Sequence, residues 1–151
     1  MIKRLVLVVF VCLTALLISS CGGGGGSSSG VAFNEALAGY YRVFGTERVC
    51  VSWYCEDSSV DTIKHVSTSG KMTDTNTSTV SFCSISKKTW SNTWTTAIVN
   101  YTISCSLSGV SFTASCYLTA NLATLSATSS CVGSGEGEIL TAQGRFSIEA
   151  V

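Results

Sequence analysis

The chain has 151 residues, no proline and a formal net charge of zero. Charged residues make up 12% of it, about half the usual ~25%, so serine and threonine supply most of the polarity. The length suits one domain, and the lack of a basic field argues against binding to nucleic acid. A composition without proline and rich in β-branched residues favours long, uninterrupted strands.

The first 20 residues have the pattern of an export signal. Lys3 and Arg4 precede an apolar run over residues 5–18, and two small serines follow before Cys21. A transmembrane helix needs about 20 apolar residues, so this run is too short. The order of charge, apolar segment and small residues predicts a secretory signal peptide over residues 1–20, which is removed on export.

The motif Ile18-Ser19-Ser20-Cys21 resembles the lipobox of bacterial lipoproteins. This resemblance implies that the Cys21 thiol carries a diacylglycerol, that cleavage occurs just before Cys21, and that the new amine is acylated. In that family an Asp after the Cys retains the protein at the inner membrane. Here Gly22 takes that place, so the resemblance implies an outer-membrane anchor on the periplasmic or surface face. The alternative is an ordinary secretory signal.

Residues 21–32 form a glycine- and serine-rich linker between the lipidated cysteine and a single domain, residues 33–151. Such a segment behaves as a flexible coil with a root-mean-square reach of roughly 17 Å for about ten residues. Loss of Lys3 and Arg4 with the signal leaves a slightly acidic mature chain. We expect the domain to move freely close to the membrane.

Six cysteines remain in the domain after Cys12 is removed with the signal and Cys21 is lipidated. An even number in an exported domain predicts three disulfides. A metal site is not expected, because His65 is the only histidine and no Cys-x-x-Cys pair occurs. The six are Cys50, Cys55, Cys83, Cys105, Cys116 and Cys131.

The first half of the domain contains weakly patterned strands. Residues 34–38 are compatible with a short helical turn, and residues 45–46 and 69–70 with reversals. A closing strand is expected at residues 146–150, after a glycine-rich loop at 133–137. The other expected strands of this weaker set cover residues 39–44, 48–54, 62–68, 71–75 and 79–86.

Residues 98–131 alternate clearly between apolar and polar side chains, which is typical of half-buried strands. Ser108-Gly109 predicts a tight hairpin turn. A second reversal centred on Ala123-Thr124 would place Cys116 opposite Cys131, within reach of a disulfide.

The other two bridges follow less directly. Cys83 and Cys105 lie on either side of a reversal near Trp94, and Cys50 and Cys55 remain as the third pair. That last bridge requires the residues between its cysteines to turn. Six cysteines allow 15 connectivities, so other pairings stay open.

Successive strands with hairpin-length connections predict an all-β antiparallel up-and-down meander. Such a sheet removes its exposed edges by closing into a small barrel like those of lipocalins. A disulfide-stapled β-sandwich is the alternative. Residues 31–151 carry no family signature, so this fold class implies no function.

No enzyme is expected. His65 reads as a strand histidine facing solvent, with no nucleophile motif beside it. Glu56, Asp57 and Asp61 lack the spacing of a calcium loop and read as a solvated acidic loop. Two further carboxylates, Glu136 and Glu138, lie in the glycine-rich loop, which would position them poorly for acid–base chemistry. The segment 74–78 contains a short glycosylation-acceptor pattern at Asn76, of a kind common by chance.

Lys87, Lys88, Trp90 and Trp94 lie together at an expected strand connection. Exposed aromatic side chains beside cations are typical of contact surfaces, so this segment is a candidate binding loop. The alternative is that the tryptophans close one end of the barrel. Trp53 and Tyr54 pose a similar choice, with at least one of them inward.

Two functions are compatible with these features. In the first, the outer-membrane lipoprotein binds a small apolar ligand or an envelope component, with a hollow lined by Val99, Tyr101, Phe112, Leu118 and Leu122. In the second, the barrel is filled and acts as a protein-contact module, as an inhibitor of an exported enzyme or an accessory subunit of an envelope complex. Both versions are non-enzymatic and need no cofactor beyond the acyl chains on Cys21.

Overall fold

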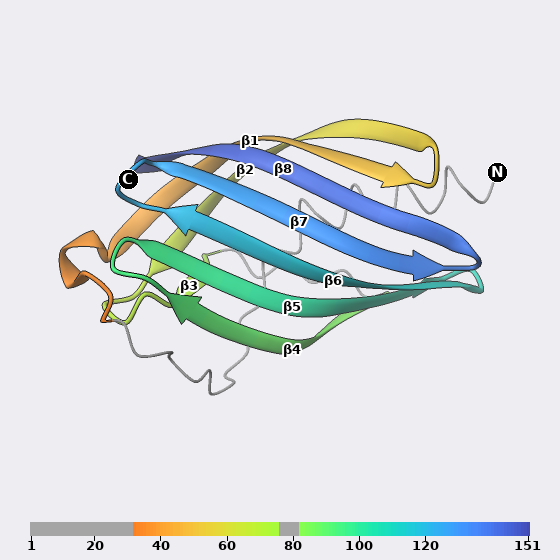
Figure 1. Cartoon of the computed structure of the whole chain (residues 1–151), viewed down its shortest axis with the longest axis horizontal. Coiled ribbons are helices and arrows are strands. Elements are labelled where there is room, and N and C mark those ends of the chain that lie inside the picture. The colour runs from red at the N-terminus through yellow and green to blue at the C-terminus, as the bar shows by residue number, and fades with distance from the viewer. Residues whose placement is uncertain (1–31, 76–81) are drawn as a thin grey trace.

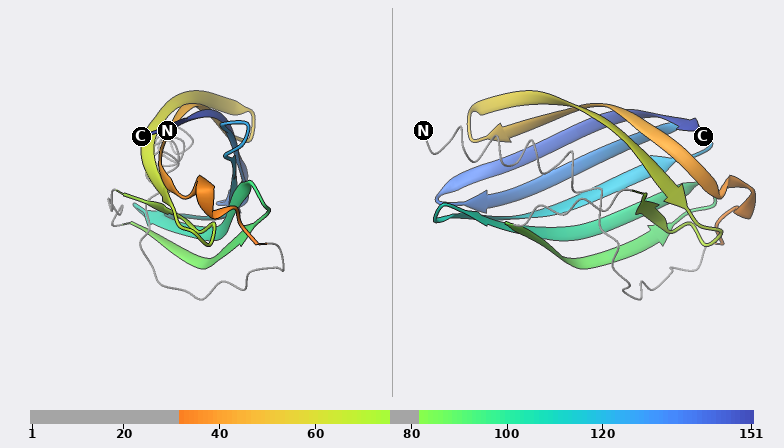
Figure 2. Two further views of the ribbon diagram at one scale, coloured as in Figure 1. Left: turned by 90° about the vertical axis from the view of Figure 1, so that its left-hand side faces the viewer. Right: turned by 180° about the vertical axis from the view of Figure 1, so that it is seen from behind.

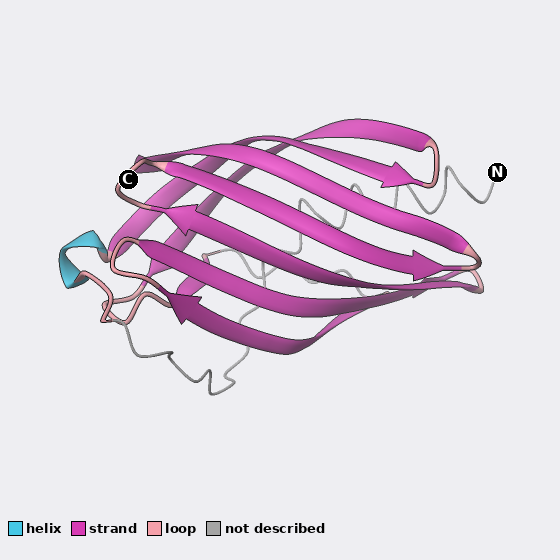
Figure 3. Cartoon of the chain, viewed as in Figure 1, coloured by secondary structure: helices cyan, strands magenta, loops and turns pink. Residues whose placement is uncertain are grey.

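The computed structural model describes residues 32–75 and 82–151 of the chain. Cys21, the predicted signal peptide and Asn76 lie outside these residues. One short 3-10 helix, η1 (Glu35–Leu37), begins the described part, as expected, and the rest is built from strands (Figure 3). The eight strands described are β1 (Gly39–Val51), β2 (Tyr54–Val66), β3 (Met72–Asp74), β4 (Cys83–Asn92), β5 (Thr96–Leu107), β6 (Val110–Asn121), β7 (Ser126–Gly135) and β8 (Glu138–Ala150).

All eight strands belong to one antiparallel sheet in the order β3-β2-β1-β8-β7-β6-β5-β4. Each pair of neighbours is consecutive in the chain except β1 and β8, which pair over residues 41–51 and 140–150. This long-range pairing wraps the meander into a nearly closed barrel, with β3 and β4 at its two edges (Figures 1 and 2). The predicted meander and barrel are confirmed, and the sandwich alternative is wrong.

The barrel closes through side chains where β3 faces β4. Trp90 of β4 donates its Nε1 hydrogen to the carbonyl oxygen of Met72 at 3.1 Å. The Lys71 ammonium lies 4.1 Å from the centre of the Trp90 ring, in cation–π range. Because β3 has only three residues, this seam depends on few contacts.

The two turns predicted within residues 98–131 and all three predicted disulfides are confirmed. Ser108 and Gly109 both have positive φ and form the two-residue turn between β5 and β6. Cys116 lies directly opposite Cys131, and the two are bonded. The same holds for the other two expected pairs, Cys83–Cys105 and Cys50–Cys55, the last across a turn at Ser52 and Trp53.

The reversal expected at residues 45–46 is wrong, because β1 runs unbroken from Gly39 to Val51. Gly45 faces inward, where a Cβ atom would lie only 3.1 Å from the Phe146 ring. The glycine therefore permits close packing of β1 against β8. The acidic residues from Glu56 to Asp61 likewise lie in β2, and the glycine-rich loop is the end of β7 plus a turn at Glu136 and Gly137.

Inward-facing apolar side chains form two separate core clusters along the barrel. One contains Val49, Ile103, Phe112, Leu140 and the Cys116–Cys131 bridge. The other contains Val43, Trp90, Leu118 and Phe146, among others. Tyr101 packs against both clusters, and polar side chains lie near it in the middle of the barrel.

Candidate functional site

Four ionisable side chains point into the middle of the barrel, each from a different strand. Glu47 comes from β1, Lys64 from β2, Asp74 from β3 and Lys88 from β4. Lys88 faces inward because the pairing of β4 with β5 is irregular between Ser86 and Thr89. One extra residue in β4 at this point shifts the alternation, so that even-numbered residues from Lys88 onward face the interior. We call these four residues the inner cluster.

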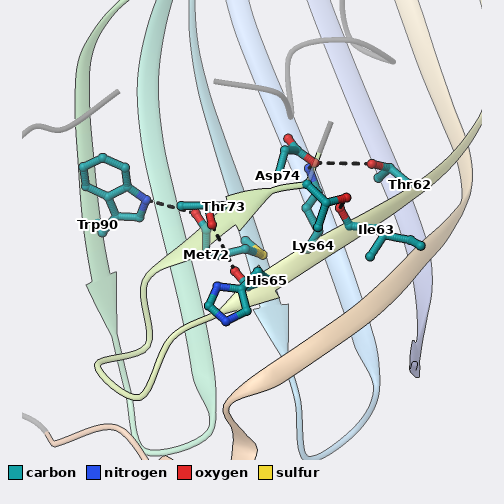
Figure 4. A network of polar contacts seen from close by, with 9 residues as sticks. Thr62, Ile63, Lys64, His65, Met72, Thr73, Asp74 and Trp90 are labelled. Carbon is teal, nitrogen blue, oxygen red and sulfur yellow. Dashed lines mark hydrogen bonds and ion pairs between the residues drawn. The ribbon is translucent and has the colours of Figure 1, made fainter. Parts of the chain in front are cut away.

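Lys64 and Asp74 form a buried ion pair, with 2.7 Å between the lysine Nζ and a carboxylate oxygen (Figure 4). Thr62 donates a hydrogen bond to the same oxygen at 3.3 Å. Burial lowers the pKa of Lys64 to about 8, although the pairing with Asp74 opposes this shift. Burial also raises the pKa of Asp74, against the opposing effects of Lys64 and Lys88.

Glu47 is the second buried carboxylate of the inner cluster. Ser129 donates its hydroxyl hydrogen to Glu47 Oε1 at 2.8 Å, and Gly144 lies between the two residues in register. Among the described residues, Oε2 of Glu47 and Oδ2 of Asp74 have no hydrogen-bond partner. Burial and the neighbouring negative charges of Glu47 and Asp74 raise the pKa of the Tyr101 hydroxyl.

The cavity beside the inner cluster has a volume of about 30 Å³. A buried water needs roughly 10–15 Å³ on this scale, so the cavity has room for about two waters. The five residues expected to line an apolar hollow do face inward, and Val99, Phe112, Leu118 and Leu122 are buried against their neighbours. Around the inner cluster, the described residues therefore nearly fill the barrel interior, and the remaining space there is partly polar.

The expected binding loop is only partly a loop. Lys87, Lys88 and Trp90 lie in β4, and Trp90 is buried at the seam, so their placement in a connection is wrong. Only Trp94 lies in the turn after β4, and it is 56% exposed. The irregularity in β4 interrupts the two-residue alternation of inward and outward side chains, so the sequence pattern did not predict a strand here. Trp53 is exposed at the β1–β2 turn, whereas Tyr54 packs against the core.

His65 lies on the outward side of β2, whereas Glu136 and Glu138 lie at the turn between β7 and β8. The His65 ring lies 4.7 Å from that of Tyr40. Glu138 accepts a hydrogen bond from the Ser52 hydroxyl, and Glu136 accepts one from the Ser111 amide at 3.4 Å. The described part of the chain contains no group of three or more His, Cys, Asp or Glu side chains able to hold a metal ion.

The outer wall also carries an open hollow of about 610 Å³, which we call the outer groove. It extends over β1, β2, β6, β7 and β8, whose order around the barrel places these strands side by side. Sequence alternation marks these side chains as outward but does not reveal that β1 pairs with β8. The polar residues that line the groove include Arg48, Asp57, Tyr117, Thr128, Gln143 and Arg145.

Within residues 32–75 and 82–151, no helix is long and apolar enough to cross a membrane. Comparison of the chain with protein-family models, curated proteins and solved structures finds no match.

Proposed function

We propose that this protein is a lipid-anchored, non-enzymatic binding protein of the bacterial outer membrane, and that its barrel binds an envelope component through its outer surface. The lipobox-like motif at Cys21 and the flexible linker support the anchor. The three disulfides are in keeping with an oxidising envelope compartment.

The nearly filled interior is the observation that carries this proposal. A cavity of about 30 Å³ is far below the roughly 300–1,000 Å³ of pockets that enclose small molecules. An apolar ligand would also lie against the buried ionisable groups beside the cavity. It offers them no hydrogen bonds, so its binding would leave these groups with fewer partners at a cost in free energy. Binding on the outer wall is therefore favoured over an enclosed apolar ligand.

Native mass spectrometry of the Cys21→Ser chain, produced in its own host, tests the interior. We expect the mass of the oxidised chain alone, because a cavity of this size retains only water. A reproducible additional small-molecule mass would contradict the proposal and favour a carrier function.

Co-sedimentation with washed envelope fragments from the host tests the outer surface. The folded Cys21→Ser chain is expected to sediment with the fragments in a saturable manner. The same chain after reduction and alkylation of its disulfides provides the control. Equal recovery of both forms, or no sedimentation of the folded form, would argue against a binding function of the barrel.

A further inference from the structure

We infer that the outer groove is a binding site for an anionic saccharide, that is, a sugar carrying a phosphate or a carboxylate. This inference rests on the proposed function and specifies the surface and the ligand class. Three observations support it, namely the unequal pairing of the arginines on this wall, the neutral hydrogen-bonding groups around them, and the size of the groove.

Three arginines project from the outer wall on β1 and β8, and they differ in their pairing. Arg42 makes two hydrogen bonds of 2.8 Å to Asp61 and lies 3.6 Å from Glu149. Arg48 reaches Asp57 only at 3.9 Å. Among the described residues, Arg145 has no carboxylate within ion-pair distance. Arg42 lies outside the groove, so the two weakly paired guanidinium groups are those that line it.

Arg48 and Arg145 are diagonal neighbours on adjacent strands. Arg48 is opposite Gln143, and Arg145 is opposite Thr46. Residues in this relation lie about 7–8 Å apart, with their Cβ atoms somewhat closer, so the two guanidinium groups can converge on one anion. The planar donors of arginine match the oxygens of both carboxylates and phosphates. The proposed ligand class therefore includes sugars that carry either anion.

Neutral hydrogen-bonding side chains surround the arginines. Gln143 of β8 is paired in register with Ser130 of β7, which is paired with Tyr117 of β6. Arg145 of β8 is paired with Thr128 of β7. Amide and hydroxyl groups both donate and accept, as sugar hydroxyls require. Tyr117 is 48% exposed and offers an apolar ring face together with its hydroxyl.

The size of the groove suits a short saccharide. Its volume of about 610 Å³ lies within the range of small-ligand sites. Arg48 and Tyr117 are separated by three strand spacings, which amounts to roughly 14 Å. An inorganic ion would contact the arginines alone, whereas a disaccharide would also reach the tyrosine.

The test is titration of the lipidated chain in detergent micelles, followed by backbone amide shifts. The probes are trehalose 6-phosphate and digalacturonate, with trehalose and inorganic phosphate as controls. We expect saturable shifts on β1, β7 and β8 with at least one anionic sugar. Affinity for either control should be weaker by about tenfold or more, which corresponds to loss of one charge-assisted contact. Whichever anionic sugar binds more tightly identifies the anion as phosphate or carboxylate.

Two arginine variants localise the site. Arg145→Gln should weaken binding of the anionic sugar by about tenfold or more, because a guanidinium contact to the anion is lost. Arg42→Gln is the matched control and should change affinity by about twofold or less, because that arginine is already paired outside the groove. Equal effects of the two variants, no saturable shifts with either anionic sugar, or phosphate binding as tightly as the sugars would each overturn the inference.

The same variants separate this inference from the proposed function. If the folded Cys21→Ser chain sediments with envelope fragments and the same chain carrying Arg145→Gln sediments equally well, the barrel binds elsewhere and only the groove assignment fails. If the Cys21→Ser chain does not sediment, the proposed function itself fails.

Discussion

Lys64 and Asp74 are both almost completely shielded from water, with side-chain exposures of 1% and 2%. Moving two charges out of water costs several kcal/mol per ion, and their attraction offsets this cost only in good geometry. The unpartnered oxygen of Asp74 indicates that the offset is incomplete. The pair therefore specifies how β3 lies against β2 more than it stabilises the barrel.

Breaking this pair should cost more than replacing it. Lys64→Met should destabilise the fold by about 3–5 kcal/mol, nearer the lower value because Lys88 still faces Asp74. Lys64→Met combined with Asp74→Leu should be close to wild type or more stable, because no unpaired charge remains. Urea unfolding of the single and double variants measures both values. Additive losses would contradict this account of the pair.

The pKa of Lys64 predicts a rise of stability at alkaline pH. Its value is about 8 in the folded chain and 10.5 ordinarily, so above about pH 8 the unfolded chain binds more protons at this site. The free energy of unfolding should therefore increase from about pH 8 to about pH 10. Beyond that, Tyr101 acts in the opposite direction, since its raised pKa makes the folded chain retain the proton.

Urea unfolding at a series of pH values checks this rise. The reference is the double variant at positions 64 and 74, which also removes Asp74 from the titration while Glu47, Lys88 and Tyr101 remain. The rise should be absent from that variant. A rise of the same size in both proteins would assign it to another group.

At the scale of elements, β3 and β4 decide whether the barrel closes. β3 has three residues, and β4 requires an irregularity at Lys87 to bring Lys88, Trp90 and Asn92 inward. A shift by one residue would move all three to the outer face. The seam is thus the part of the sheet where fewest interactions determine the register.

Trp90→Phe should loosen this seam. It removes the donor to the Met72 carbonyl, and a buried acceptor left unsatisfied costs about 1–3 kcal/mol. Hydrogen exchange should become faster in β3 before it changes in β6. Trp94→Phe is the control, because that ring is 56% exposed and its replacement should cost about 0.5 kcal/mol or less. Equal effects of both changes would contradict the seam's dependence on Trp90.

At the scale of the whole molecule, the first described residues, with η1, lie at the barrel end where the chain also finishes (Figure 1). The Asn34 amide donates to the Trp94 carbonyl, and the Val151 amide donates to the Tyr40 carbonyl. The outer groove lies along the side wall of the barrel and not at this end. With the proposed anchor on Cys21, we expect this end to lie nearest the membrane.

Cys21→Ser should release the protein from the membrane. Stable anchoring requires more than one acyl chain, and no chain can be attached without the thiol. After cell fractionation we expect the wild type in the outer-membrane fraction and the variant in the soluble periplasmic fraction. Cys12→Ser is the matched control and should leave the distribution unchanged. A variant that stays in the membrane fraction would contradict the lipid anchor.

The linear order of the residues determined the strands and turns of residues 98–131, which depend on near neighbours. Alternation in residues 98–131 predicted long strands, and the turns at Ser108-Gly109 and Ala123-Thr124 predicted the register that joins Cys116 to Cys131. Hairpin register follows from turn length and a two-residue repeat, both of which are local properties. The all-β meander could therefore be predicted from the sequence.

Only the tertiary structure decided the features that depend on distant strands. Pairing of β1 with β8 kept Gly45 inside a continuous strand and brought Arg48 and Arg145 together on one wall. Closure of the barrel gathered Glu47, Lys64, Asp74 and Lys88 from four strands around one small cavity, of which three line it directly. Alternation predicts whether a side chain faces inward or outward. Its neighbours depend on strand pairings that join residues as far apart as Tyr41 and Ala150, a separation of 109 positions.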